Sequence, residues 1–323
     1  MQAGVVAKDA GSSVVMRDCD ASYNGRIGVA ALVGGKVEAT RCTVQRNMRV
    51  GLGAWHRGSK VSIYQCEASD NGATGMTAIE SGHVLANACL FKGNSNVGVV
   101  AKDLGSVVLL DNCIASHNGR IGVGARAQGR VEAVACSMHH NTQSGVAGKD
   151  AGSAILLRRC SLNQNGKYGL SVRERASVEA AECEMLCNRH MGVCVWHAAS
   201  TVSLRQCAVA HNTNYPMGIR DGATVAWHGA GAAADEHVRA EERGKDSLGS
   251  PRASTVPLSG ASVCSWACPI SPPAMPDIMV PELSQDAEAD LDRESLAALD
   301  RASLAALFQS KPAPAPACSP RRA

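Results

Sequence analysis

A glycine followed by an aliphatic residue recurs through the first two thirds of the chain at alternating intervals of 24 and 23 residues. Two units make a 47-residue double repeat, and a final interval of 26 residues indicates an insertion of about three residues near Asn214 to Pro216. A fixed period of this length is the signature of a solenoid, in which each unit packs only on its neighbours. The opening glycines are Gly4, Gly28, Gly51, Gly75, Gly98, Gly122, Gly145, Gly169, Gly192 and Gly218.

Two further columns of residues accompany the glycines. Each unit has one cysteine at a fixed place, and an asparagine follows it five residues later. The cysteines are Cys19, Cys42, Cys66, Cys89, Cys113, Cys136, Cys160, Cys183 and Cys207. The asparagines are Asn24, Asn47, Asn71, Asn94, Asn118, Asn141, Asn165, Asn188 and Asn212.

Hydrophobic residues alternate with polar ones over three short segments in each unit, as in Val5 and Ala7 or Val14 and Met16. This period of two predicts three short strands per unit, and no helical period occurs before residue 230. Aromatic residues make up only 3%, so Val, Ala, Leu, Ile and Cys must fill the core. We therefore expect an all-β fold, a parallel β-solenoid of about nine coils of 23–24 residues. A side-chain amide both donates and accepts, so asparagines stacked every ~4.8 Å predict a hydrogen-bonded ladder.

The pattern G-V-x-A, then V-x-A/L-x-x-C, then N resembles the right-handed parallel β-helix superfamily, with its pectate-lyase-like fold, over residues 3–229. The resemblance implies a right-handed coil. It does not imply one activity, because the superfamily contains pectate lyases, polygalacturonases, alginate epimerases and non-catalytic regions of F-box proteins.

Composition changes after the repeats and predicts four segments. Residues 1–229 form the β-helix, 230–282 a disordered linker, 283–309 a short amphipathic helix with a leucine stripe, and 310–323 a disordered tail. The first repeat begins at Gly4 without a cap, so we expect further coils or a domain to precede it.

The cysteine column predicts reduced thiols, because stacked side chains point in parallel and a disulfide needs a rotated torsion. With no signal-peptide core in the first 30 residues, this indicates an intracellular, cytoplasmic protein. No run of 18 apolar residues occurs, which excludes a transmembrane helix. The pair Cys264 and Cys268 lacks a second ligand pair, so neither a metal nor a cofactor is predicted.

The turn after the first strand of each coil carries charged residues on neighbouring coils. Carboxylates about 5 Å apart can share a proton and act as acid and base on a sugar. If the protein is an enzyme, its catalytic residues are predicted to be Glu80, Asp103, Asp150 and Glu174. Solvated turns that carry charge for solubility are the alternative. Residues predicted to bind a ligand beside them are Trp55, His56, Trp196, His197, Lys102 and Lys149.

Two other columns carry charge. His117 and His140 fall on neighbouring coils with His139 beside them, which we interpret as unrelated surface histidines rather than a metal site. A basic column two residues after the ladder can attract an anionic polymer along the axis. Its members are Arg26, Arg49, Arg120, Lys167 and His190.

The function predicted from these patterns is a non-enzymatic scaffold that binds a protein or a polysaccharide along the solenoid. A carbohydrate-active lyase, hydrolase or epimerase is the first alternative, but the D-P-H-D, N-T-D and G-H-G motifs of the resembling enzymes are missing. The substrate-recognition part of a ubiquitin ligase is the second. Residues 1–229 hold 23 Lys and Arg against 16 Asp and Glu, too mild an excess to predict specific nucleic-acid binding. No membrane partner is predicted.

Overall fold

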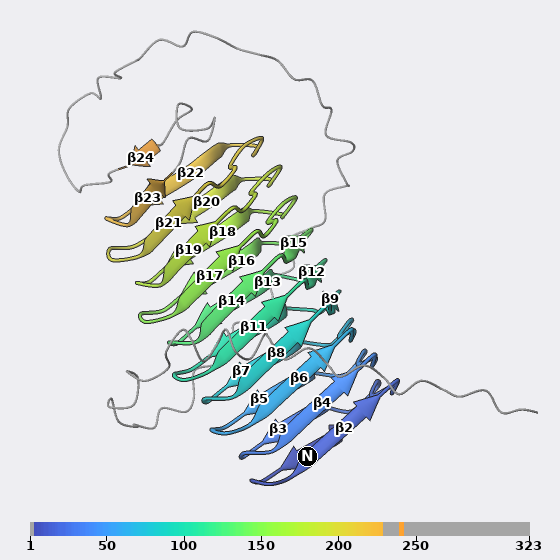
Figure 1. Cartoon of the computed structure of the whole chain (residues 1–323). Helices are drawn as coiled ribbons and strands as arrows, with labels where there is room; N and C mark the ends of the chain where they lie inside the picture. Colours follow the sequence, from blue (N-terminus) through green and yellow to red (C-terminus); the bar gives the residue numbers. More distant parts are fainter. Residues whose placement is uncertain (1–2, 229–238, 242–323) are drawn as a thin grey trace, which may run out of the picture. The chain divides into compact units, whose positions relative to one another are not determined.

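The computed structural model describes residues 3–228 and 239–241. It confirms the all-β parallel solenoid of about nine coils: strands of successive coils lie side by side in register (Figure 1). The predicted helix 283–309 and tail 310–323 lie outside the described residues. Within the predicted linker 230–282 only β24 (Arg239–Glu241) is described, and it pairs with the strand Tyr215–Arg220.

The first strand of each coil belongs to an 11-stranded parallel sheet, which we name sheet A. Its strands are β1 (Ala3–Lys8), β3 (Ile27–Leu32), β5 (Val50–Trp55), β7 (Thr74–Ile79), β10 (Val97–Lys102), β13 (Ile121–Arg126), β16 (Ser144–Lys149), β18 (Tyr168–Arg173), β20 (Met191–Val195), β22 (Tyr215–Arg220) and β24.

The second strand of each coil belongs to a 10-stranded parallel sheet, sheet B. Its strands are β2 (Ser13–Arg17), β4 (Lys36–Thr40), β6 (Lys60–Tyr64), β8 (His83–Asn87), β11 (Val107–Asp111), β14 (Arg130–Val134), β17 (Ala154–Arg158), β19 (Ser177–Ala181), β21 (Thr201–Arg205) and β23 (Thr224–His228).

The third side of the coil is short. Three central coils form sheet C from β9 (Leu90–Lys92), β12 (Ile114–Ser116) and β15 (Ser137–His139), and single bridges continue it on either side. Within the described residues no helix is long and apolar enough to cross a membrane.

The register of the last coil differs from the sequence prediction. Met191 pairs with Tyr215 and Val193 pairs with Met217, so Pro216 occupies the column of the opening glycines. The interval from Gly192 is therefore 24 residues, and the insertion expected from the interval of 26 does not exist. Gly218 instead pairs with Cys194, two positions further along the strand.

The core is one continuous column of small and medium side chains. Inward residues of one sheet A column, such as Val29, Leu52, Met76 and Val99, are fully buried, and Phe91 is the largest of the fully buried side chains. Small residues suffice because each coil is thin and packs directly on its neighbours, which explains how so few aromatic residues can support the fold.

The asparagine ladder is present. Asn118 donates from its backbone N–H to Asn141 Oδ1 at 3.1 Å and from Nδ2 to the same oxygen at 2.9 Å, and Asn94 donates to Asn118 Oδ1 in the same way. Asn118 Nδ2 also donates to the carbonyl of Phe91 at 3.1 Å. The left-handed residue of this turn is not the asparagine but the one before it, such as His117 with φ 57°.

Candidate binding face

The outer side of sheet A has a central column of mostly small residues. Its members alternate along the strands with the inward residues of the core. A second apolar cluster of Ile27, Ala30 and Leu32 lies apart from the core on this side. Along the sheet the column contains Ala30, Gly53, Thr77, Val100, Gly124, Ala147, Ser171, Cys194 and Gly218. Val100 and Ala147 of this column are half-buried, whereas Ala30, Thr77 and Cys194 are buried.

Basic residues border this column where the strands end. Lys102 and Arg126 are partners in register, and so are Lys149 and Arg173, so four successive coils each present a cation. Strands β1 to β22 of sheet A contain no Asp or Glu, whereas sheet B contains several. The basic residues of these strands, β1 to β22 of sheet A, are Lys8, Lys102, Arg126, Lys149, Arg173 and Arg220.

A second basic border lies where the chain enters sheet A. Arg26, Arg49, Arg120, Lys167 and His190 each stand directly before a sheet A strand. The sequence prediction of a basic column along the axis is therefore a column at the edge of the same face.

Trp55 lies over the small residues near the N-terminal end of the face. A Cβ added to Gly53 would lie 2.3 Å from a ring carbon of Trp55, so the indole covers the glycine directly. The ring also packs on the cluster of Ile27, Ala30 and Leu32. Glycine at position 53 is what allows the indole to lie against the sheet.

A second aromatic group lies near the other end of the face. The Tyr168 ring meets the Trp196 ring edge to face at 5.2 Å and the His190 ring at 5.4 Å. Burial raises the pKa of Tyr168, and burial raises the pKa of Cys194 to about 12. Both groups are therefore neutral at pH 7. Among the described residues, the buried Nδ1 of His190 has no hydrogen-bond partner.

The predicted catalytic residues lie in the turn from sheet A to sheet B, each with positive φ. Glu80 Oε2 lies 3.2 Å from His56 Nε2, and Asp103 lies 3.8 Å from Lys102 Nζ. Asp150 accepts a hydrogen bond from the backbone of Ala127 at 3.0 Å.

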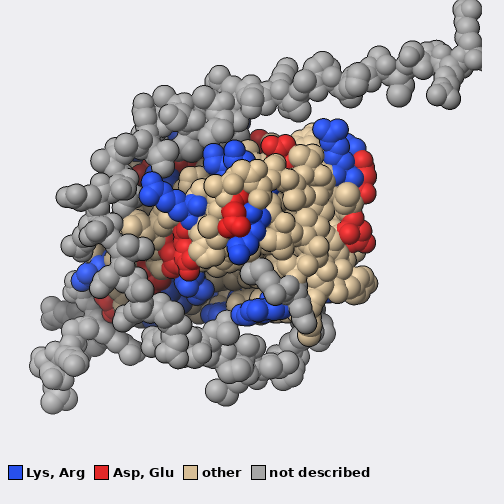
Figure 2. All heavy atoms as spheres, turned by 90° about the horizontal axis from the view of Figure 1, so that it is seen from below, with Lys and Arg blue, Asp and Glu red and all other residues tan. Residues whose placement is uncertain are grey.

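Glu174 of this turn lies 3.6 Å from Lys149 Nζ and 3.9 Å from Arg173 Nε. In the described part of the chain, these contacts join each of the four carboxylates to a histidine, a basic side chain or a backbone N–H, and not to another carboxylate. His197 occupies the same turn column with φ 68°. Figure 2 shows that basic and acidic side chains lie in small mixed groups on the side of the molecule seen from below.

Three histidines come together beside sheet C, which differs from the interpretation that they are unrelated. The His117 and His140 rings stack 5.0 Å apart, and the Nδ1 atoms of His139 and His140 lie 2.8 Å apart. Burial, then the neighbouring His140, lowers the pKa of both His117 and His139. The sequence places these residues on neighbouring coils, but only the ring orientations show that they touch.

This cluster predicts a pH-dependent contribution to stability. A histidine whose pKa is lower in the folded state binds fewer protons there, so its contribution is complete above the ordinary value of 6.5. That contribution is lost as pH falls through the lowered folded pKa values. Urea unfolding from pH 8 to pH 5 should therefore show a steeper loss for the native chain than for the variant His117→Gln with His139→Gln. His83, whose pKa is also lowered by burial, is kept in both chains. Parallel profiles would contradict the prediction.

Comparison with known proteins supports the fold. Residues 81–229 match the family model described as a right handed beta helix region. Comparison with curated proteins gives no match. The A-module of mannuronan C-5 epimerase AlgE4 from Azotobacter vinelandii is similar in structure, with a TM-score of 0.53 and 15% identity over 70% of this chain and 79% of that one. Pectate lyase Pel9A aligns with a TM-score of 0.40 and 13% identity over 73% of this chain and 69% of that one.

Proposed function

Because this chain is a right-handed parallel β-helix, we propose that it binds an acidic polysaccharide along the outer face of sheet A. The observation that carries the proposal is the charge of that face: the sheet A strands from β1 to β22 hold six basic residues and no acidic one. The neighbour named as a mannuronan C-5 epimerase indicates which class of ligand to test first.

The geometry favours an extended polyanion. Lys102, Arg126, Lys149 and Arg173 are repeated with the step of the coils, about 4.8 Å, so their charges form a row rather than a point. Guanidinium groups bind carboxylates with two parallel hydrogen bonds, which suits the acid groups of a uronate chain. Trp55 and the pair of Tyr168 and Trp196 add apolar ring surface to the same face, on which sugar rings can stack.

Binding to alginate, to polygalacturonate and to neutral dextran tests this function. Changing Lys102, Arg126, Lys149 and Arg173 together to Gln should weaken binding of both acidic polymers about 100-fold, or about 2.7 kcal/mol. The matched control changes two Lys and two Arg of sheet B to Gln: Lys36, Lys60, Arg158 and Arg205. Both variants lose the same net charge, so an equal loss of affinity would contradict a site on sheet A. Equal binding of dextran would contradict recognition of the acid groups.

A second candidate function is enzymatic modification of such a polymer. The likeness to the epimerase module favours it, together with Glu174, whose carboxylate lies beside Lys149 and Arg173 at the edge of the face. A cation that neutralises a uronate carboxylate makes the neighbouring carbon–hydrogen bond more acidic, and a nearby carboxylate can accept that proton. Turnover of alginate or polygalacturonate, followed by proton NMR, should then vanish in Glu174→Gln. For the predicted pair on the other coils, the test is Glu80→Gln with Asp103→Asn.

A further inference from the structure

Three buried side-chain polar atoms lack a hydrogen-bond partner among the described residues, and all three belong to sheet A or to the border where the chain enters it. They are Thr77 Oγ1, Asn96 Oδ1 and His190 Nδ1. Thr77 lies in the central column of the outer face, whereas Asn96 and His190 stand directly before β10 and β20. A buried polar group without a partner costs free energy, so each of these atoms calls for a physical reason.

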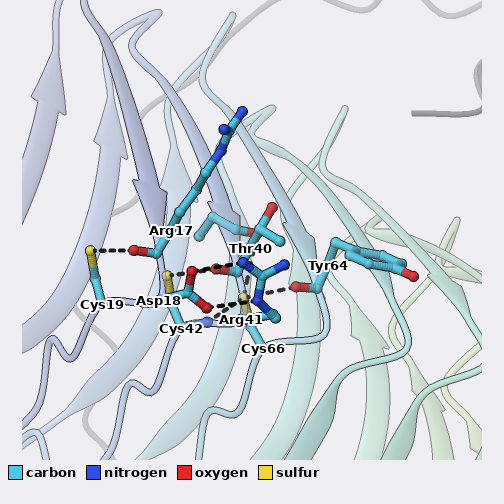
Figure 3. A network of polar contacts seen from close by, with 9 residues as sticks. Arg17, Asp18, Cys19, Thr40, Arg41, Cys42, Tyr64 and Cys66 are labelled. Carbon is cyan, nitrogen blue, oxygen red and sulfur yellow. Dashed lines mark hydrogen bonds and ion pairs between the residues drawn. The ribbon is translucent and has the colours of Figure 1, made fainter. Parts of the chain in front are cut away.

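The corner after sheet B contrasts with this face. All nine cysteines of the column there are free, as the sequence predicts. The Cys42 thiol donates to the carbonyl of Thr40 at 3.3 Å, and the exposed Arg41 donates two hydrogen bonds to the Asp18 carboxylate at 2.6 and 2.7 Å (Figure 3). Polar groups at this corner are satisfied from within the chain, even where water can reach them. The unpartnered atoms are therefore a feature of the sheet A side, the face proposed above to bind a ligand.

Thr77 is the most deeply buried of the three residues. Only 2% of it is exposed, whereas Asn96 and His190 are half-buried. Its partner in register on the next coil is Val100, which has nearly the same shape without a hydroxyl. Packing in this column therefore does not require the Thr77 hydroxyl, which can both donate and accept a hydrogen bond.

The Trp55 indole covers this position. A Cβ added to Gly53 would clash with Cη2 and Cζ3 of the Trp55 ring and would lie 2.8 Å from Thr77 Cγ2. The far edge of the indole therefore lies on the glycine and against Thr77. Trp55 is half-buried and its ring turns about two side-chain torsions, so it can leave the glycine without a change in the backbone. Its departure uncovers Gly53 and the side chain of Thr77.

This position is in line with the basic row. Trp55 pairs in register with Ile79, and Ile79 pairs with Lys102. The indole therefore lies two coils, about 10 Å, before the first cation of the row. A polymer that is bound to the row through its carboxylates and extends toward β1 brings a sugar ring over Gly53 and Thr77.

We propose that Gly53, Trp55 and Thr77 form a subsite for one pyranose ring of the acidic polysaccharide, an inference that rests on the function proposed above. The sugar ring displaces the indole from Gly53, and one sugar hydroxyl forms a hydrogen bond with Thr77 Oγ1. The displaced indole stacks on the carbon–hydrogen face of the sugar. Thr77 gains its missing hydrogen bond only in the complex, so it favours a ligand that carries hydroxyl groups over another polyanion.

Affinities for alginate and for polyglutamate, a polyanion without sugar rings, test the subsite. Thr77→Val should weaken alginate binding about tenfold and leave polyglutamate binding unchanged. Thr77→Ser is the matched control, because it keeps the hydroxyl, and it should bind alginate within about twofold of the native chain. Equal binding of alginate by the native chain and by Thr77→Val would overturn the subsite.

The stability of the same variant tests whether the hydroxyl is unpartnered. The urea midpoint of Thr77→Val should equal or exceed that of the native chain, because no hydrogen bond is lost. A lower midpoint would show that the hydroxyl is already bonded inside the protein, and this too would overturn the subsite.

Fluorine NMR of the chain labelled with 5-fluorotryptophan follows the indole directly. Trp55→Phe assigns the Trp55 resonance, and Gly53→Ala supplies the reference for a displaced ring, because its Cβ would take the place of the ring edge. Alginate should move the Trp55 resonance of the native chain toward its position in Gly53→Ala. A resonance that stays in place while alginate binds would contradict the displacement.

Failure of the proposed function would give a different result. If the native chain did not bind alginate, or if the change of the four cations to Gln left alginate binding unaltered, the function and the subsite would both be overturned. Alginate binding that depends on the four cations but not on Thr77 would leave the function intact and overturn the subsite alone.

Discussion

Replacement of Asn118 by Ala should destabilise the solenoid by about 4 kcal/mol. The change removes three hydrogen bonds of buried groups: those that the backbone N–H and Nδ2 of Asn94 donate to Asn118 Oδ1, and the one that Asn118 Nδ2 donates to the carbonyl of Phe91. Asn94 Nδ2 keeps its second bond, to the carbonyl of Ala68. Each buried polar group that loses its hydrogen bond costs about 1–3 kcal/mol. The backbone N–H of residue 118 keeps its bond to Asn141, so the loss belongs to the side chain alone.

Urea unfolding followed by circular dichroism measures this effect. Asn214→Ala is the matched control, because Asn214 lies outside the ladder and is exposed; it should change stability by less than about 0.5 kcal/mol. Equal unfolding midpoints for the two variants would show that the ladder does not hold the coils together.

Much of the fold is predictable because each repeated column has one physical role. The asparagines form hydrogen bonds within a buried turn, and the cysteines pack as small apolar side chains. The glycines occupy positions where a side chain has no room. The last coil is the exception. Pro216 there replaces the glycine that the sequence pattern follows, so counting from Gly218 shifts the register by two residues.

The candidate site is less predictable because it depends on side-chain directions. The sequence predicts Trp55 and Trp196 at outward turn positions, but it does not show that the Trp55 ring lies over Gly53 or that Trp196 packs on Tyr168. The turn acids occupy equivalent positions on their coils, yet their contacts to cations within and between coils appear only in three dimensions. The charge of sheet A follows from the sequence once its strands are known, since those from β1 to β22 contain no acid.

The glycine column predicts a second large effect at Gly122. A Cβ added there would lie 2.7 Å from Asn141 Nδ2 and 2.7 Å from the carbonyl oxygen of Gly145, closer than atoms that do not bond can approach. Both neighbours are held, one by the ladder and one by the backbone of the next coil, so neither can move freely. We expect Gly122→Ala to destabilise the protein by about 3 kcal/mol, because overpacking costs about 1–3 kcal/mol and the ladder is strained as well.

Gly124→Ala is the matched control, since it makes the same chemical change on the same strand β13. A Cβ at Gly124 would have its nearest neighbour at 3.6 Å, an ordinary contact on the outer side of sheet A. Replacing glycine in a strand by alanine there should be neutral or stabilise by up to about 1 kcal/mol, because the unfolded chain loses freedom. The urea midpoint should therefore fall for Gly122→Ala and stay or rise for Gly124→Ala. The free energies of unfolding of the two variants should differ by about 3 kcal/mol. If both alanines shift the midpoint alike, space beside the ladder is not what selects glycine, and the column needs another explanation.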